Sequence, residues 1–174
     1  MKDYEFTLKF SLSDNNINSE IYIERLEEKC NDALIGIGKK GSIGLNFNRQ
    51  SDSAYNAIAS AIADVKKAIP DAKLIEASPD FVGLTDIAEL FGFTRQNMRK
   101  IKESNANDFP APVHEGLASI WHLSKVLSWL KEKKLYVVND TLLDISKVTM
   151  LVNITKESTE IEYPLAENIR QLLV

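Results

Sequence analysis

The sequence predicts an α+β protein. Three observations lead to this prediction: segments that alternate polar and apolar residues like half-buried strands, segments with apolar residues at helical spacing, and turn residues between them. Over residues 1–78 the segments follow the order strand, helix, strand, strand, helix, strand. This order predicts a four-stranded antiparallel sheet with both helices on one face, the ferredoxin-like arrangement.

The elements of residues 1–78 are expected to form one domain. The expected strands are 4–10, 34–37, 43–47 and 72–77, and the expected helices are 19–33 and 51–69. The first strand, YEFTLKF, alternates regularly, while the second helix carries alanine, isoleucine and valine along one stripe and ends before Pro70.

A glycine motif lies between the second and third expected strands. Gly36, Gly38 and Gly41 satisfy the pattern G-x-G-x-x-G. A dinucleotide-binding motif must follow a strand and open a helix, so that the pyrophosphate meets the helix N-terminus. Because these glycines lie between two strands, the sequence favours a hairpin turn, and a nucleotide cradle is the alternative.

The composition gives no support for an enzyme. Cys30 is the only cysteine, and His114 and His122 are the only histidines, which argues against a disulfide framework and a zinc site. The chain contains neither a serine-hydrolase elbow nor a cysteine-nucleophile signature. We therefore expect no cofactor, and we expect Cys30 to be a core residue. No signal peptide or membrane span is predicted, which favours the cytoplasm.

Residues 79–134 begin with the pattern of a short helix, a tight turn and a second helix. The segment LTDIAELFG places Ile87, Ala88 and Phe91 on the inner face of the first helix. Gly92 can adopt the positive φ that ends this helix, and Thr94 is expected to cap the next one.

The second helix, in TRQNMRKIK, combines an apolar face and a cationic face. Met98 and Ile101 are spaced to pack on the first helix, which turns Arg95 and its polar neighbours outward. Arginine can donate two hydrogen bonds to guanine, amide side chains can pair with adenine, and lysine can pair with phosphate. Residues 79–134 hold eight Lys or Arg against seven Asp or Glu, the only net-positive third of a chain with formal net charge −4. The alternative is a solvated surface helix.

Residues 82–130 resemble a known family. The matching segments are VGLTDIAELFGFTRQNMRKI, DFPAPV and SIWHLSKVLSWL. They are similar to the AlpA-type prophage regulators and excisionase-like proteins, relatives of the MerR DNA-binding domain, which carry a winged helix-turn-helix. The resemblance covers less than a third of the chain. It implies that residues 79–134 form a DNA-binding domain whose ligand is double-stranded DNA.

The resemblance also implies a wing and a third helix. The wing strands would be residues 109–113 and 119–121, with Glu115 at the tip, and Ser124 would cap the helix. Because Glu115 would repel phosphate, we expect the wing to contact DNA weakly, through His114 or backbone amides, or not at all. The candidate DNA-binding residues are Thr94, Arg95, Gln96, Asn97, Arg99, Lys100, Lys102 and His114.

Residues 135–174 predict two amphipathic helices. The first carries Leu142, Ile145, Val148 and Leu151 at spacings of three residues, and the second begins at Pro164. Such faces suit an isologous interface, so we expect a homodimer held by this C-terminal region. The alternative is that both faces pack inside one chain.

Together these patterns predict a sequence-specific DNA-binding transcriptional regulator of prophage, antitoxin or defence-system type. The alternative is an antitoxin-like interaction adaptor, whose acidic flanking regions bind a partner protein and whose DNA binding is secondary or lost. A regulator needs Arg95, Gln96 and Arg99 exposed, whereas an adaptor could bury or pair them. An RNA or ligand site on the N-terminal domain is less favoured, because that domain is net negative and lacks a stacking pair of aromatic residues.

Overall fold

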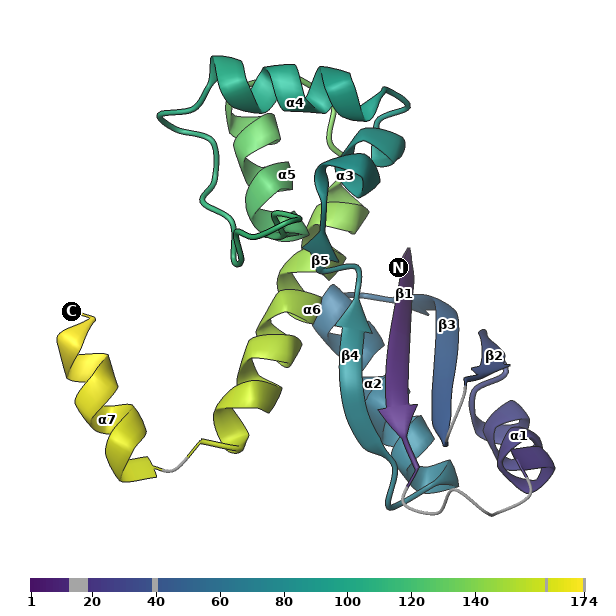
Figure 1. The fold of residues 1–174 in the computed structure, drawn as a ribbon. Coiled ribbons are helices and arrows are strands. Elements are labelled where there is room, and N and C mark those ends of the chain that lie inside the picture. Colours follow the sequence, from purple (N-terminus) through teal and green to yellow (C-terminus); the bar gives the residue numbers. More distant parts are fainter. Residues whose placement is uncertain (13–18, 39–40, 162, 174) are drawn as a thin grey trace.

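The chain is an α+β structure that begins with a four-stranded antiparallel sheet (Figure 1). The computed structural model describes residues 1–12, 19–38, 41–161 and 163–173. The elements of the first part are β1 (Lys2–Ser11), α1 (Ser19–Lys29), β2 (Ala33–Ile37), β3 (Ser42–Ser51), α2 (Ala54–Ala68) and β4 (Lys73–Ser78). The strands lie in the order β2-β3-β1-β4, so all four predicted strands and both predicted helices are confirmed.

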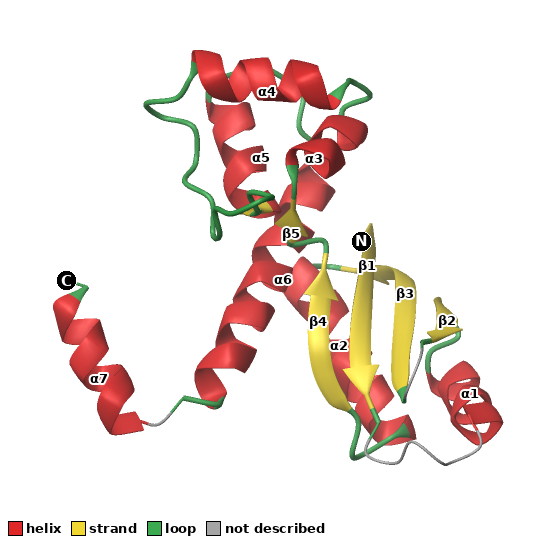
Figure 2. Cartoon of the chain, in the orientation of Figure 1, coloured by secondary structure: helices red, strands yellow, loops and turns green. Residues whose placement is uncertain are grey.

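One face of this sheet is buried beneath α1 and α2 (Figure 2). On the two central strands, Phe6 lies opposite Phe47 and Leu8 opposite Leu45, and all four side chains are buried. Fully burying an apolar side chain of this size is worth about 1.5–3 kcal/mol. The alternation read from the first strand therefore separates the core face from the polar face, as a period of two requires.

Arg49 of β3 pairs with two aspartates that lie outside the sheet. Its Nε and Nη2 donate to Asp32 at 2.6 and 2.9 Å, and its Nη1 donates to Asp64 of α2 at 3.0 Å. The hydrogen bond from Arg49 lowers the pKa of Asp32 below its ordinary value. Close by, burial raises the pKa of Cys30 to about 11. The thiol therefore stays protonated near neutral pH, which agrees with its predicted place in the core.

The glycine motif forms part of the predicted hairpin between β2 and β3. Gly36 lies within β2 and pairs with Gly44, and Gly41 has a φ of 70°, which favours glycine. Residues 39–40 of the motif lie outside the described part of the chain. A strand beginning at Ser42 follows the motif where a dinucleotide site needs a helix. The hairpin prediction is therefore confirmed.

A second, smaller core lies beyond β4. Its elements are β5 (Phe81–Val82), α3 (Leu84–Leu90), α4 (Arg95–Ser104), β6 (Trp121–His122) and α5 (Leu123–Glu132). Phe109 packs edge-on against both Trp121 and Trp129, with ring centroids 6.0 and 5.0 Å apart. Both tryptophans are buried, so they are core residues.

The segment between α4 and β6 differs from the predicted wing. Residues 109–113 form no strand, because Pro110 and Pro112 have no N–H group to donate to a neighbouring strand. The pairing of this segment is limited to one isolated antiparallel bridge, in which the N–H groups of Val113 and His114 donate to Ile120 O. Strand β6 pairs with β5 instead. The predicted strand over residues 109–113 is therefore wrong, although a narrow hairpin exists nearby.

The start of α5 also differs from the prediction. The N-cap residue is His122, and Ser124 lies inside the helix. The Ser124 side chain is buried, and its Oγ donates to Met150 Sδ at 3.2 Å. Ser124 therefore contributes to helix packing and does not cap α5.

The long helix α6 (Asp140–Thr159) packs on both cores. Asn139 Oδ1 caps it by accepting from the N–H groups of Thr141 and Leu142 at 2.8 and 3.1 Å. Ile145 belongs to the core beneath the sheet and Leu143 to the second core. This helix therefore connects the two parts of the molecule (Figure 1).

A buried polar cluster joins α6 to the segment between β4 and β5. Asn153 Oδ1 accepts from Ala77 N at 2.8 Å, and its Nδ2 donates to Ala77 O and to Asp80 Oδ2, both at 2.8 Å. Asp80 Oδ1 lies 2.7 Å from His122 Nδ1, and Thr149 Oγ1 donates to Pro79 O at 2.6 Å. The Asp80 carboxylate thus holds the buried His122 ring at the start of α5.

The C-terminal helix α7 (Tyr163–Leu172) lies apart from both cores (Figure 1). Ile145 is buried, and Leu142 and Val148 pack against the core beneath the sheet, so most of the stripe predicted on α6 is used inside the chain. Leu151 is exposed. No helix among residues 1–12, 19–38, 41–161 and 163–173 is long and apolar enough to cross a membrane.

The cluster around Asn153 makes a testable prediction about stability. Replacing Asn153 by Ala should leave the Ala77 amide groups and one Asp80 oxygen without partners, which should cost about 2–4 kcal/mol of unfolding free energy. Urea denaturation with an unchanged slope would measure the loss. Replacing the exposed Asn107 by Ala is the matched control and should change stability by less than about 0.5 kcal/mol. Equal losses in the two variants would contradict a special role for Asn153.

Candidate nucleic-acid interface

A tight turn between α3 and α4 sets the direction of α4. The Gly83 N–H donates to the Asp86 carboxylate at 2.7 Å where α3 begins. After α3, Gly92 has a φ of 70°. Thr94 Oγ1 then accepts from the Asn97 N–H at 3.2 Å and caps α4. The predicted roles of Gly92 and Thr94 are therefore confirmed.

Aromatic side chains pack together at this turn. Phe91 and Phe93 stack with their ring centroids 5.6 Å apart. Tyr136, from the segment between α5 and α6, lies 4.9 Å from the Phe93 ring. The start of α4 is thus packed against the connection that leads into α6.

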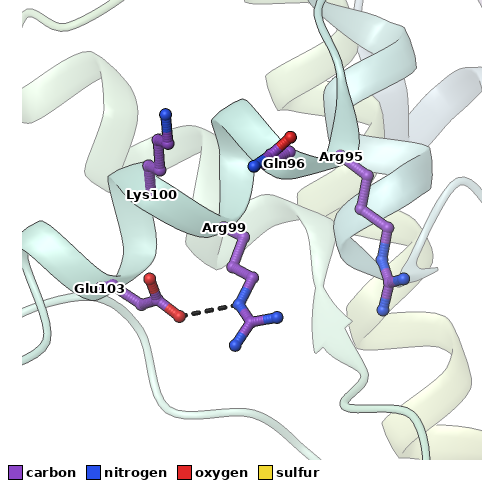
Figure 3. Close-up of a pocket in the computed structure, with 5 residues that line it drawn as sticks. All are labelled: Arg95, Gln96, Arg99, Lys100 and Glu103. Carbon is purple, nitrogen blue, oxygen red and sulfur yellow. Dashed lines mark hydrogen bonds and ion pairs between the residues drawn. The ribbon is translucent and has the colours of Figure 1, made fainter.

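Helix α4 has one core face and one polar face. Met98 is fully buried and Ile101 is half-buried against the second core. Four polar residues face outward and are exposed, and with Glu103 they line a shallow hollow on the surface (Figure 3): Arg95, Gln96, Arg99 and Lys100. The two faces therefore lie as the spacing of the apolar residues predicted.

Glu103 contacts only one of the cationic side chains. Its Oε1 accepts from Arg99 Nε at 2.7 Å (Figure 3), and this hydrogen bond raises the pKa of Arg99 above its ordinary value. Within the described part of the chain, Arg95, Gln96 and Lys100 have no side-chain partner. The hollow thus presents the exposed side-chain donors of Arg95, Gln96 and Lys100.

Lys102 is placed differently from the other cations of α4. It is half-buried, and its Nζ lies 5.0 Å from the centre of the Trp121 ring, a cation–π contact. The Trp121 Nε1 donates to Pro110 O at 2.9 Å. The ammonium group of Lys102 therefore supports the packing of α4 on the second core, although the sequence suggested a phosphate contact.

The remaining candidate residues are not all part of the hollow. The Thr94 hydroxyl is engaged in the helix cap, and Asn97 is exposed at the start of α4. His114 is exposed in the narrow hairpin, which precedes β6 and lies at the far end of α5 from α4 (Figure 1). The structure therefore does not bring His114 together with the outward face of α4.

Glu103 is the member of this surface that the candidate set omitted. It lies four residues after Arg99, a spacing at which side chains on a helix meet. That spacing was visible in the sequence, but spacing alone did not show that the two side chains would pair. The structure shows that it holds one of the two arginines.

No candidate metal centre lies among the described residues. Among residues 1–12, 19–38, 41–161 and 163–173, no group of three or more histidine, cysteine, aspartate or glutamate side chains could hold a metal ion. Comparisons with family models, with curated proteins and with solved structures find no match to the chain.

The contrast between two neighbouring lysines can be tested. Lys102→Ala should lower the unfolding free energy by about 0.5–1 kcal/mol, because it removes the contact with Trp121. Lys100→Ala is the matched control, and because its side chain is exposed it should change stability by less than about 0.5 kcal/mol. Thermal or urea unfolding of both variants measures the difference. Greater destabilisation by Lys100→Ala would contradict the assignment.

Proposed function

We propose that the chain is a cytoplasmic, sequence-specific DNA-binding transcriptional regulator. In this proposal α3, α4 and the hairpin form a winged helix-turn-helix, and α4 is the helix that enters the major groove. One observation carries the proposal: α4 is anchored by Met98 while Arg95, Gln96 and Arg99 of the same helix stay exposed. A regulator needs these three side chains exposed, whereas an adaptor could bury or pair them. Among the described residues Arg95 and Gln96 have no side-chain partner, and Arg99 is exposed but paired with Glu103.

The chemistry of the exposed side chains suits a DNA groove. The major groove is about 12 Å wide and admits an α-helix. Arg95 and Arg99 can each donate two hydrogen bonds to the O6 and N7 atoms of guanine, and Gln96 can pair with adenine. Lys100 can pair with a phosphate, which gives affinity without sequence preference.

Two further observations support the proposal. The resemblance of residues 82–130 to AlpA-type and excisionase-like proteins favours a regulator of prophage, antitoxin or defence-system type. The strand order β2-β3-β1-β4, with both helices on one face, supports a ferredoxin-like fold for the N-terminal domain.

We also propose that the protein works as a homodimer joined through α7 and the end of α6. Exposed apolar side chains gather there: Leu151, Ile154, Ile161, Leu165, Ile169, Leu172 and Leu173. Covering them would remove a sizeable apolar surface from water, and a standard interface buries roughly 800 Å² per partner. A dimer would also offer two recognition helices to a palindromic site, which compensates for the small cationic area of one copy.

An interaction adaptor is the second candidate function. The same exposed apolar residues of α7 favour it, because a partner protein could cover them in place of a second copy. Selection of binding sites from random DNA duplexes separates the two functions. An enriched motif supports the regulator, and failure to enrich any motif at concentrations where the protein is dimeric supports the adaptor.

The first prediction from this proposal concerns base recognition. Arg95→Ala and Arg99→Ala should each weaken binding to the selected duplex by about 1–3 kcal/mol, because each removes a bidentate contact with a base. Fluorescence anisotropy at constant salt measures the affinity. Lys125→Ala, at an exposed position of α5, is the control and should leave sequence preference unchanged. Equal affinity of wild type and the Arg95/Arg99 double variant would remove the assignment.

The second prediction concerns the dimer. Ile169→Glu combined with Leu172→Glu should convert the dimer to a monomer, because two carboxylates would be buried in the interface without partners. Light scattering over a range of concentrations measures the mass. Glu167→Gln in α7 is the matched control and should remain dimeric. A wild-type protein that stays monomeric at high micromolar concentration would refute the dimer.

A further inference from the structure

The geometry of Arg99 separates its three nitrogen atoms into two groups. Nε donates to Glu103 Oε1 at 2.7 Å, whereas Nη1 and Nη2 have no hydrogen-bond partner among the described residues. Figure 3 shows both terminal nitrogens beyond the ion pair, directed away from the helix. Glu103 thus holds the inner side of the guanidinium and leaves its outer edge available.

Helix stability gives little reason for Glu103 at this position. The pair is open to solvent, with 70% of the Arg99 side chain and 59% of the Glu103 side chain exposed, so water screens the attraction. Glu103 lies in the last turn of α4, where the helix dipole disfavours an anion. The order of the pair, cation before anion, is also the weaker one for residues four apart. A residue that breaks local rules in this way points to a role at a functional surface.

Resting on the proposed function, we propose that Glu103 is a positioning residue for base recognition, which orients Arg99 so that Nη1 and Nη2 together donate to O6 and N7 of one guanine. An arginine can approach guanine with its two terminal nitrogens or with Nε and one terminal nitrogen. Because Glu103 accepts from Nε, the pair favours the first approach. It also removes rotamer freedom from Arg99 before DNA binds, which lowers the entropic cost of the contact.

The pairing selects guanine over adenine for a chemical reason. Guanine offers two acceptors in the major groove, O6 and N7, whereas adenine offers one acceptor and one donor. Two fixed N–H donors therefore match guanine and oppose the amino group of adenine. A mobile arginine could turn away and pair with a phosphate instead, so the loss of Glu103 should relax the selection.

The test compares the sequence preference of wild type, Glu103→Ala and Glu103→Gln by binding-site selection and by anisotropy on matched duplexes. Glu103→Ala should lower the preference for guanine over adenine at one position by about tenfold. Affinity for unrelated duplexes should stay equal or increase, because a carboxylate near phosphate is removed. Glu103→Gln should fall between the two, since its amide oxygen can still accept from Nε. Glu89→Ala, an exposed residue of α3, is the control and should keep the wild-type motif.

The outcomes separate this inference from the proposed function. An unchanged guanine preference in Glu103→Ala would overturn the role of Glu103 alone. An equal loss of affinity for every duplex, together with a lower melting temperature, would indicate a purely structural role and would also overturn it. If the wild-type protein binds no duplex DNA, both proposals are overturned.

Discussion

The arrangement of the molecule depends on the hydrogen bonds between Asn153 of α6 and the short segment that links β4 to β5. A side-chain amide that pairs with both polar groups of the Ala77 backbone extends the sheet's hydrogen bonding into a helix. The third bond, to Asp80, continues through His122 into the second core. Because unpaired polar groups are costly in such a buried place, the bonds favour one orientation of α6. The apolar contacts of this helix with both cores then follow from that orientation.

The outward face of α4 is a consequence of how its inner face is held. Three kinds of contact hold the helix against the second core: the buried Met98, the aromatic residues at the turn, and the contact between Lys102 and Trp121. The four cationic residues of α4 therefore differ in their contacts. Lys102 contributes to packing, Arg99 is paired with Glu103, and Arg95 and Lys100 are exposed. Net charge alone would treat all four as equivalent.

Much of the fold could be predicted because it depends on short-range patterns. Alternation located the first strand, and short apolar runs between turn residues located the other three. Gly92 and Thr94 located the turn before α4, since a positive φ and a helix cap are local requirements. The wing was less predictable. Residues 109–113 are extended in character, but whether an extended segment pairs depends on a neighbouring strand and on free N–H groups, and two prolines remove those. The pairing of β5 with β6 joins residues about forty positions apart, which local spacing does not reveal.

In the candidate site too, local features could be predicted from the sequence and long-range contacts could not. Exposure of Arg95, Gln96 and Arg99 followed from helical periodicity. The contact of Lys102 with the second core could not be predicted from periodicity, because it depends on the ring of Trp121, a residue distant in sequence. Likewise, the apolar spacing of α6 correctly predicted a face that must be covered, but Leu142, Ile145 and Val148 of that face are covered by the same chain.

The continuous length of α6 sets a distance within the molecule. Its 20 residues correspond to about 30 Å of rigid helix, with α4 near one end and α7 beyond the other. In the DNA-bound dimer proposed above, the length of α6 would contribute to the separation between the two α4 helices. The phase of two half-sites on the DNA would then be encoded in the number of helical turns of a single element, so that lengthening α6 by one turn would shift the tolerated spacing between half-sites.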